Sequence, residues 1–427
     1  MSPMKNEAVA DLVSNTLEEL LDQVRGDRSG ELADYIPQLA QVDPEGLALS
    51  VVSSTGRIYA VGDHDQHFTL QSASKPFVYA LALSQRGPDV VHERVGYEPS
   101  GEPFNAISLD AEGRPANPMI NAGAIVTSSL IEGATPDARF EAIRHCVSAF
   151  AGRELELDEA VYASETATGH RNRALANLAL AAGTLDRTVI DATDVYFRQC
   201  SLKVTATDLA VMGATLSNNG VNPLTGVQVM TPEVVRRTLA IMLSCGMYNY
   251  SGYWMNDVGL PAKSGVGGGI VAVSPGKFGV GTYSPRLDPS GSSVRGVAAL
   301  RLMSNQLGLH LLNHPSEAAA SFNADDSSFD NLILRMRGEL DFACVERIVH
   351  ELSEHGDTIK SVHMDLGEST AVVPTARGML KDLQEVLAHE DIPITIDDPR
   401  DFIETEPHLK APEPHVADAH APLPENQ

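Results

Sequence analysis

Apolar residues recur along the chain at two spacings, one typical of helices and one typical of strands. Leu17, Leu20, Leu21 and Val24 share one helix face, so an amphipathic helix that ends near Gly26 is expected at the N-terminal end. Short strand patterns follow, then a long helical stretch, and then strands again. The expected strands lie at residues 47–53, 57–61, 68–70 and within 262 to about 302, and the expected helices at 138–151, 172–182, 190–200, 206–217 and 232–243.

This order of elements predicts an α+β fold for the larger, N-terminal part of the chain. Strands at both ends enclose a helical middle, and the end strands are expected to join one antiparallel sheet. Residues 87–118, rich in Gly, Pro and Asn, are expected to form long loops. A shared sheet would bring the strand that contains Lys263 back to Ser72.

A second, smaller unit is expected after the composition changes near Leu312. Residues 314–328 are polar and rich in Ala, Ser and Asp, and are interpreted as a linker. Patterns for strand, helix, strand, helix and strand then follow in the order of a small α/β unit, at residues 332–336, 341–355, 361–366, 375–389 and 392–396. The last residues carry many prolines and few apolar side chains, so disorder is expected there. We predict domains at 1–313 and 329–403, a linker at 314–328 and a tail at 404–427.

Composition and charge narrow the classes of function. The chain has 427 residues and a formal net charge of -26, from 57 acidic and 31 basic residues. This surplus of acids argues against nucleic-acid binding, which needs a basic face, and against anionic membranes. The sequence has no apolar run of membrane-spanning length and no apolar signal-peptide region, and its four cysteines form no Cys-x-x-Cys pair. We therefore expect a cytoplasmic protein with reduced thiols.

The pattern Ser72-x-x-Lys75 places two reactive groups at the start of an expected helix. Pro76 is tolerated in a first helical turn, so Ser72 is expected at or just before the helix N-terminus, with Lys75 on the same side. A serine becomes nucleophilic when a base takes its proton, and a lysine with a lowered pKa can be that base. Ser-x-x-Lys is also the signature of penicillin-binding proteins and serine β-lactamases. An isolated match is more often a helix-capping serine, so a second motif is needed before Ser72 is interpreted as a nucleophile.

Lys263-Ser264-Gly265-Val266 supplies that second motif. It lies in a Gly-rich apolar run expected to be a strand, and it matches the Lys-Thr-Gly strand motif of the same superfamily, with serine for threonine. In that fold the strand edge faces the nucleophile, and by this resemblance the N–H groups of Ser72 and Val266 would form the oxyanion hole. A Gly-rich turn is the alternative interpretation. A phosphate-binding loop is excluded, because Gly-Lys-Ser/Thr with the required upstream glycine is absent.

The region from about residue 30 to 310 resembles the serine-dependent glutaminase family, which has the β-lactamase-like fold: an antiparallel sheet with a helical subdomain. Several motifs in the family's order carry the resemblance. They are Tyr35-Ile36-Pro37-Gln38-Leu39, Gln71-Ser72 with Lys75, Asn117-Pro118-Met119-Ile120-Asn121-Ala122-Gly123-Ala124, Ser164-Glu165 with Arg171-Asn172, Tyr196-Phe197 with Cys200-Ser201, Ser244-Cys245-Gly246-Met247-Tyr248, and Leu260-Pro261-Ala262-Lys263-Ser264-Gly265-Val266.

The resemblance implies a role for each matched side chain. The carboxylate of Glu165 would bind the α-ammonium of glutamine, and Asn121, Asn172 and Tyr196 would hold the other end. Each residue also has an ordinary alternative: a solvated charge for the Glu, a turn or cap for each Asn, and a core ring for each Tyr. Because all these motifs match together and in the family's order, we favour the functional roles over the ordinary alternatives. The implied catalytic residues are Ser72, Lys75, Tyr35, Tyr248 and Lys263, and the implied substrate-binding residues are Ser72, Asn121, Glu165, Asn172, Tyr196, Tyr248 and Val266.

We therefore expect an enzyme that hydrolyses L-glutamine to L-glutamate and ammonia. Ser72 would form a glutamyl-enzyme, with Lys75 and Tyr248 as proton-transfer groups. No cofactor or metal is expected, because this reaction needs none. A zinc motif is rejected as well, because His350 and His355 are five residues apart and would not share a helix face. The resemblance also implies a homo-oligomer, either a dimer or a tetramer.

The C-terminal unit resembles the STAS domain of anti-sigma-factor antagonists, in its element order and in the strand end Asp365-Leu366. Where that family typically carries Asp-Ser, this chain has Val373-Pro374, which argues against a phosphoryl switch. Two alternative functions stay open. One is a penicillin-recognising or β-lactamase-type hydrolase, and the other is a glutamine-sensing regulatory protein that acts through the STAS-like domain.

Overall fold

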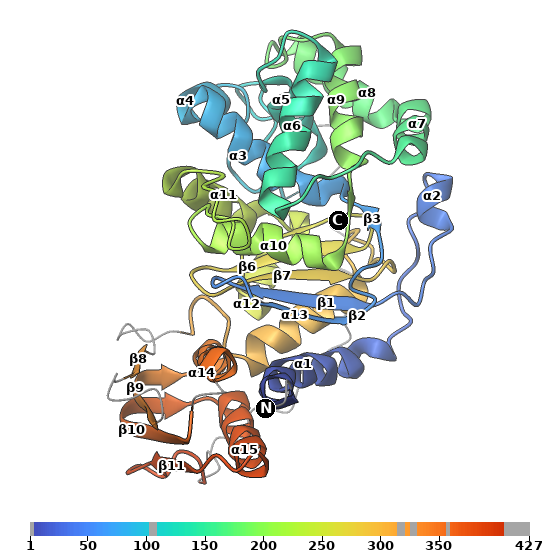
Figure 1. Ribbon diagram of the computed structural model, residues 1–427. Coiled ribbons are helices and arrows are strands. Elements are labelled where there is room, and N and C mark those ends of the chain that lie inside the picture. The colour runs from blue at the N-terminus through green and yellow to red at the C-terminus, as the bar shows by residue number, and fades with distance from the viewer. Residues whose placement is uncertain (1–3, 102–108, 314–320, 325–330, 356–358, 405–427) are drawn as a thin grey trace, which may run out of the picture. The chain divides into compact units, whose positions relative to one another are not determined.

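The computed structural model describes residues 4–101, 109–313, 321–324, 331–355 and 359–404 of the chain. The chain divides into two compact units. The larger is Ala10–Glu317, and the smaller joins Ala318–Gln427 to Met1–Val9. Figure 1 draws the larger unit mainly in blue, green and yellow, and the smaller unit mainly in orange and red. The domain boundaries predicted from the sequence remain predictions.

The larger unit is organised around a five-stranded antiparallel sheet in the order β2-β1-β7-β6-β5. The strands are β1 (Ala48–Ser53), β2 (Ile58–Gly62), β5 (Ala262–Ser264), β6 (Gly269–Ser274) and β7 (Phe278–Tyr283). The predicted pairing of strands from the two ends of this unit is confirmed. The third predicted strand does not join this sheet, because β3 (Phe68–Thr69) pairs instead with β4 (Lys203–Val204).

One long helix, α10 (Ala206–Ser217), lies between this sheet and the remaining helices on that side (Figure 1). It begins with a capping box in which the Thr205 side chain accepts from the Asp208 N–H and the Asp208 carboxylate accepts from the Thr205 N–H. Glycines in β7 permit its close approach. A Cβ added at Gly279 would lie 1.9 Å from the Ala214 nitrogen and 2.1 Å from the Ala210 oxygen. Helix and strand backbones are therefore in direct contact at Gly279.

Replacing Gly279 by alanine is expected to lower the free energy of unfolding by about 3 kcal/mol, because the added methyl group meets backbone atoms that cannot move aside. Thermal unfolding followed by circular dichroism measures the change. Gly252→Ala is the matched control, since a Cβ at Gly252 meets nothing within 4 Å. If both variants unfold at the wild-type temperature, the packing of α10 on β7 is not as described.

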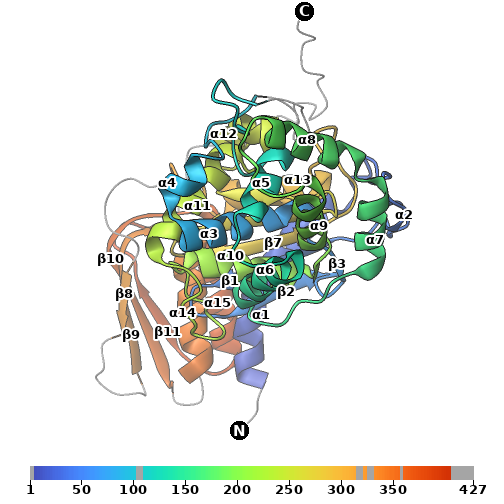
Figure 2. The ribbon, with the colours of Figure 1, turned by 90° about the horizontal axis from the view of Figure 1, so that it is seen from above.

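The remaining helices of this side form a layer that Figure 2 views from above. The N-terminal helix, the helix after Ser72 and the five helices predicted in the middle of this unit are confirmed, with ends shifted by a few residues. Four helices of more than five residues in the described part of this unit were not predicted: α5, α7, α12 and α13. The helices of this unit other than α10 are α1 (Met4–Arg25), α2 (Pro37–Ala40), α3 (Lys75–Arg86), α4 (Pro88–His92), α5 (Asn121–Ser129), α6 (Pro136–Ala151), α7 (Glu159–Thr168), α8 (His170–Ala181), α9 (Val189–Cys200), α11 (Pro232–Cys245), α12 (Ser251–Asp257) and α13 (Val294–Gln306).

The prediction of strands as far as about residue 302 is wrong, because residues 294–306 form the helix α13. Ser293 caps this helix by accepting from the Gly296 N–H. Val297, Leu300 and Met303 follow at intervals of three residues and are all buried. The apolar run was therefore helical, and its cap and spacing were the available signal.

The smaller unit contains the predicted strand, helix, strand, helix and strand in order. Its sheet has the order β11-β10-β9-β8, in which β9, β10 and β11 are parallel and β8 pairs antiparallel with β9. The elements are β8 (Ser321–Ala324), β9 (Asn331–Leu340), α14 (Phe342–His355), β10 (Ser361–Val372), α15 (Pro374–His389) and β11 (Ile394–Asp397). One strand, β8, falls inside the segment interpreted as a linker. The tail predicted to be disordered lies, apart from Glu404, outside the described residues.

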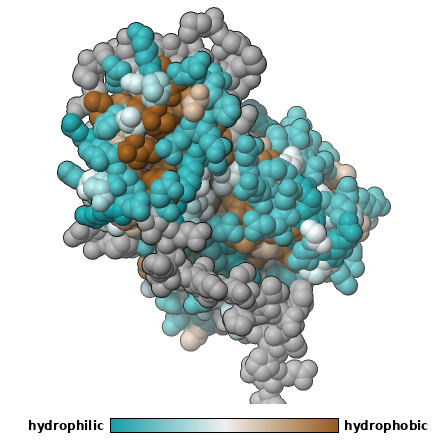
Figure 3. Space-filling model, turned by 90° about the horizontal axis from the view of Figure 1, so that it is seen from below, coloured by the Kyte–Doolittle hydropathy of each residue, from teal (hydrophilic) through white to brown (hydrophobic). Residues whose placement is uncertain are grey.

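In the view of Figure 3 hydrophilic residues cover most of the surface, and a patch of hydrophobic residues gathers at the upper left. None of the helices in the described part of the chain combines the length and the apolar character needed to cross a membrane.

Candidate active site

Ser72 lies in a short 3₁₀ turn, Gln71–Ser74, that leads directly into α3. Pro76 occupies the first turn of α3, where its missing N–H has no helical partner to lose. This places Lys75 on the same side as Ser72, and Lys75 Nζ donates a hydrogen bond of 2.8 Å to Ser72 Oγ. The predicted position of the serine, just before a helix, agrees with this geometry.

Lys75 is 1% exposed, so its charge has no access to bulk water. Burial lowers the pKa of this amine to about 7. A second hydrogen bond of 2.7 Å runs from Nζ to Asn121 Oδ1. When the amine is neutral, Asn121 can hold one N–H while the nitrogen lone pair faces Ser72 Oγ. The pair is therefore built for proton transfer near neutral pH.

Asn121 is the first residue of α5, and the chain before it folds back closely. A Cβ at Gly123 would lie only 1.9 Å from the Asn117 oxygen, so glycine is required at this position. Asn121 Nδ2 in turn donates to Asn172 Oδ1 at 3.1 Å, which joins α5 to α8. The two asparagines expected to bind substrate therefore form one connected chain with Lys75.

Tyr248 follows α11 and adopts the left-handed region, with φ 56°. Such a backbone is costly for a bulky non-glycine residue and persists only where the surrounding structure imposes it. The tyrosine is buried and hydrogen-bonded to Ser72, and burial raises the pKa of its phenol. Nζ of Lys263 lies 3.7 Å from the centre of the Tyr248 ring. Lys263 is 0% exposed, and burial followed by repulsion from Lys75 holds the pKa of this second amine well below its usual range.

The strand edge that carries Lys263 meets the nucleophile turn. A Cβ added at Gly265 would lie 2.8 Å from the Leu70 oxygen and 3.4 Å from the Ser72 nitrogen. The next residue, Val266, is partly buried and packs against the cluster of Ile36, Leu39 and Val161. Two segments that are far apart in sequence therefore meet at Ser72, as an oxyanion hole between Ser72 and Val266 would require.

Glu165, on α7, is 4% exposed and lies at the same site. Tyr35 OH donates to its Oε1 at 2.9 Å, and Gln71 also donates a side-chain hydrogen bond to it. Burial raises the pKa of the carboxyl group, and these two hydrogen bonds oppose the rise. Tyr196, which is 3% exposed, has its ring centre 6.0 Å from Lys75 Nζ. This side of the site can therefore present one buried anion to a substrate.

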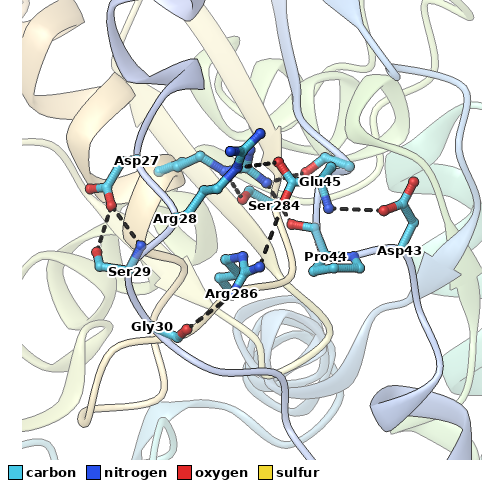
Figure 4. Close-up of polar contacts among 11 residues, drawn as sticks. Asp27, Arg28, Ser29, Gly30, Asp43, Pro44, Glu45, Ser284 and Arg286 are labelled. Atoms are coloured by element: carbon cyan, nitrogen blue, oxygen red, sulfur yellow. Dashed lines mark hydrogen bonds and ion pairs between the residues drawn. The ribbon is translucent and has the colours of Figure 1, made fainter.

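A cluster of polar contacts holds the segment before Tyr35 against Glu45 and Arg286 (Figure 4). Glu45 pairs with Arg28 at 3.2 Å and with Arg286 at 3.4 Å, and Arg286 also donates to the Gly30 oxygen. These ion pairs are largely solvent-exposed, so each contributes little to stability. Buried Arg295 adds stronger support, because it donates to the oxygens of Pro44 and Gly46.

The structure brings all the predicted site residues of both groups into one connected region, although their chemical roles remain predictions. The sequence did not assign a role to Gln71, which stands directly before Ser72, or to Gln199 behind it. A cavity of about 660 Å³ lies elsewhere, against Tyr79, His92 and Arg237, and the described residues that line it include none of the predicted set. Among the described residues, no three His, Cys, Asp or Glu side chains gather in a group that could hold a metal.

Comparison with known proteins gives consistent matches. The family model described as Glutaminase matches residues 30–312. A glutaminase of Corynebacterium glutamicum is 43% identical over 389 residues, which are 91% of this chain and 94% of the relative. Glutaminase 2 of Bradyrhizobium diazoefficiens is 53% identical over 304 residues, 71% of this chain, but this match covers 49% of that longer relative.

Solved structures match in the same way. The probable glutaminase ybaS has a TM-score of 0.69 at 41% identity, over 71% of this chain and 99% of that one. The structure of Mglu in its glutamate form has a TM-score of 0.70 at 35% identity, over 91% of this chain and 98% of that one. An alignment of 91% of the chain extends beyond the larger unit, so Mglu and the Corynebacterium relative also match part of the smaller unit.

Proposed function

The chain belongs to the glutaminase family, and on this premise we propose that it hydrolyses L-glutamine to L-glutamate and ammonia through a glutamyl ester on Ser72. The observation that carries the proposal is the contact of 2.8 Å between Lys75 Nζ and Ser72 Oγ inside a buried site. Release of ammonia and glutamate from glutamine by the purified chain tests it. Nitrocefin hydrolysis measured in parallel separates this activity from that of a β-lactamase.

Ser72 Oγ attacks the side-chain carbonyl carbon of glutamine while its proton passes to Lys75. The negative charge that develops on the carbonyl oxygen is held by the N–H groups of Ser72 and Val266. Each such donor is typically worth about 3–4 kcal/mol in the transition state. The close approach of the two segments, in which a Cβ added at Gly265 would lie 3.4 Å from the Ser72 nitrogen, supports this pairing.

The carbon–nitrogen bond then breaks, and the departing ammonia takes the proton from Lys75. A water molecule attacks the glutamyl ester, its proton passes to Lys75, and the Ser72 oxygen leaves and recovers a proton. Glutamine and water thus become glutamate and ammonia, with Ser72 and Lys75 restored. The buried amine suits both directions of transfer, because a pKa of about 7 lets it accept and return a proton at neutral pH.

Tyr248 and Tyr35 serve as hydrogen-bonding groups in this scheme. Burial raises the pKa of Tyr248, so its phenol stays protonated and orients Ser72 Oγ, and it relays a proton only in concert with Lys75. Lys263 lies against the ring of Tyr248 and completes the proposed catalytic set.

The amino-acid end of the substrate is held by neutral donors and one anion. Asn121, Asn172 and Tyr196 bind the α-carboxylate, and Glu165 binds the α-ammonium. The burial of Glu165 supports this role, because an unpaired buried carboxylate is costly and a cationic ligand removes the cost.

Replacing Glu165 by glutamine is expected to raise KM for glutamine by about 10- to 100-fold, because a charge-assisted hydrogen bond worth about 1.5–3 kcal/mol is lost. The effect on kcat is expected to be smaller. Steady-state ammonia release measures both. Glu159→Gln, an exposed position on the same helix, is the control with unchanged KM. An unaltered KM in Glu165→Gln would remove the carboxylate from the substrate site.

We propose further that the smaller unit is a STAS-like domain without a phosphoryl switch. Its three parallel strands and alternating helices support this. Val373 and Pro374 stand at the start of α15, where the STAS family carries its phosphorylatable serine. We also propose that the enzyme is a cytoplasmic homo-oligomer, and light scattering of the purified chain tests the oligomeric state.

A further inference from the structure

We propose that Gln199 is a positioning residue for the nucleophile, acting through Ser74 on the backbone that carries Ser72. This inference rests on the proposed role of Ser72. Gln199 belongs to the last turn of α9, three residues after Tyr196, and is separate from the residues proposed to touch substrate. It is 0% exposed, as is Ser74.

Two hydrogen bonds join Gln199 to the nucleophile turn. Gln199 Nε2 donates to Ser74 Oγ at 3.0 Å, and Ser74 Oγ donates to the Gln71 carbonyl oxygen at 2.7 Å. The first bond occupies a lone pair of the Ser74 hydroxyl and fixes its rotamer. The hydroxyl proton is thereby directed at the Gln71 carbonyl. The helix α9 thus restrains the peptide unit between Gln71 and Ser72.

That peptide unit needs a restraint, because Gln71 adopts a left-handed backbone with φ 48°. The Cβ atom of a non-glycine residue makes this region unfavourable, and it persists only where surrounding contacts impose it. The side chain of Gln71 is held from the other direction, by its donation to Thr69 Oγ1 at 3.3 Å and its hydrogen bond to Glu165. The carbonyl is held by Ser74 alone among the side chains described at this turn. Relaxation of Gln71 would rotate Ser72 away from Lys75.

The oxygen of the Gln199 amide indicates why a glutamine stands at this buried position: the amide N–H groups, and not the oxygen, make the useful contact. Gln199 Oε1 is buried and has no hydrogen-bond partner among the described residues. A buried unpaired acceptor reduces stability, so an apolar residue of similar volume would suit the fold better. A glutamine at this position is explained if its Nε2 donor positions the nucleophile. Stability would then favour an apolar residue here, and activity would favour glutamine.

The test is Gln199→Leu, which removes the donor and the unpaired acceptor together at similar volume. We expect kcat for glutamine to fall by about 10-fold, since displacement of a reacting group by an ångström or less is costly in rate. KM should stay within about twofold, because the proposed substrate contacts remain. The thermal midpoint should be unchanged or higher. A merely structural residue would instead lose stability and leave kcat per folded molecule intact.

Further variants make the result decisive. Ser74→Ala should lower kcat similarly, and the double variant should be no slower than Ser74→Ala, because both act through one chain of bonds. Thr193→Val, another buried polar residue of α9, should leave kcat unchanged. Additive losses in the double variant, or wild-type kcat in Gln199→Leu, would overturn the proposal. If Gln199→Leu does not fold, Gln199→Met and Ser74→Ala decide in its place.

Failure of the proposed function would look different. In that case the wild-type chain would release no glutamate, or Ser72→Ala would remain active, whatever residue stands at position 199. Wild-type and Ser72→Ala reactions measured beside the Gln199 variants therefore separate the two conclusions.

Discussion

Ser72→Ala is expected to lower kcat for glutamine hydrolysis by about 10⁴-fold or more, because removal of a catalytic nucleophile leaves only binding and oxyanion stabilisation. The side chain is small and already buried, so the fold should tolerate the loss of one oxygen. Glutamine should still bind, since Glu165, Asn121 and Asn172 remain. Coupled detection of glutamate measures the rate, and calorimetry measures the binding.

Ser84→Ala, on the helix α3 that follows the nucleophile turn, is the control for this variant. Ser84 is exposed, and its replacement should leave kcat and KM unchanged. Mass spectrometry of the wild-type enzyme quenched during turnover should detect a glutamyl adduct on the peptide that contains Ser72, and the alanine variant should give none. An alanine variant that keeps more than a few per cent of wild-type kcat would require another nucleophile.

Much of this site could be predicted from the sequence, because the local patterns of its residues and the order of the elements indicate the same arrangement. Pro76 predicted that a helix begins just after Ser72. The order of strands, then helices, then strands in the larger unit predicted one antiparallel sheet. That sheet brings Lys263 to the nucleophile although the two are far apart in sequence. Local propensity and global topology agree here, which is why the sequence was informative.

Other parts of the site depend on contacts that no local pattern announces. The left-handed backbone of Gln71 is held by the hydrogen bond that Ser74 donates to its carbonyl oxygen, and its side chain is held by donating to Glu165 on α7. The sequence around this glutamine therefore carries no turn signal. The partner of Ser74, Gln199, lies 125 positions further along the chain. From the sequence alone, a glutamine such as Gln199 cannot be distinguished from any other polar residue of a helix, because its role depends on its neighbours in space. Short helices such as α5 were missed for a related reason, because tertiary packing compensates for the glycine near its start.

Lys75 determines the second large effect, which is the dependence of activity on pH. The proposed base must be neutral to take the proton of Ser72, and burial lowers its pKa to about 7. Below that pH the protonated fraction dominates, so kcat/KM should rise about tenfold per pH unit and level off above about pH 7. Lys75→Arg should lower kcat by about 10³-fold or more at every pH, because a guanidinium does not release its proton in this range. Lys203→Arg at the surface should behave as wild type.

The same pH profile distinguishes the amine from the phenol as the base. Burial raises the pKa of Tyr248, so a phenolate base would move the rise in kcat/KM to strongly alkaline pH. Tyr248→Phe should therefore be slower than wild type yet keep its inflection near pH 7. An inflection that disappears in Tyr248→Phe, or a flat wild-type profile from pH 5.5 to 8, would contradict the assignment of Lys75. The position of the inflection thus distinguishes the buried amine of Lys75 from the phenol of Tyr248 as the group that gains and loses the proton.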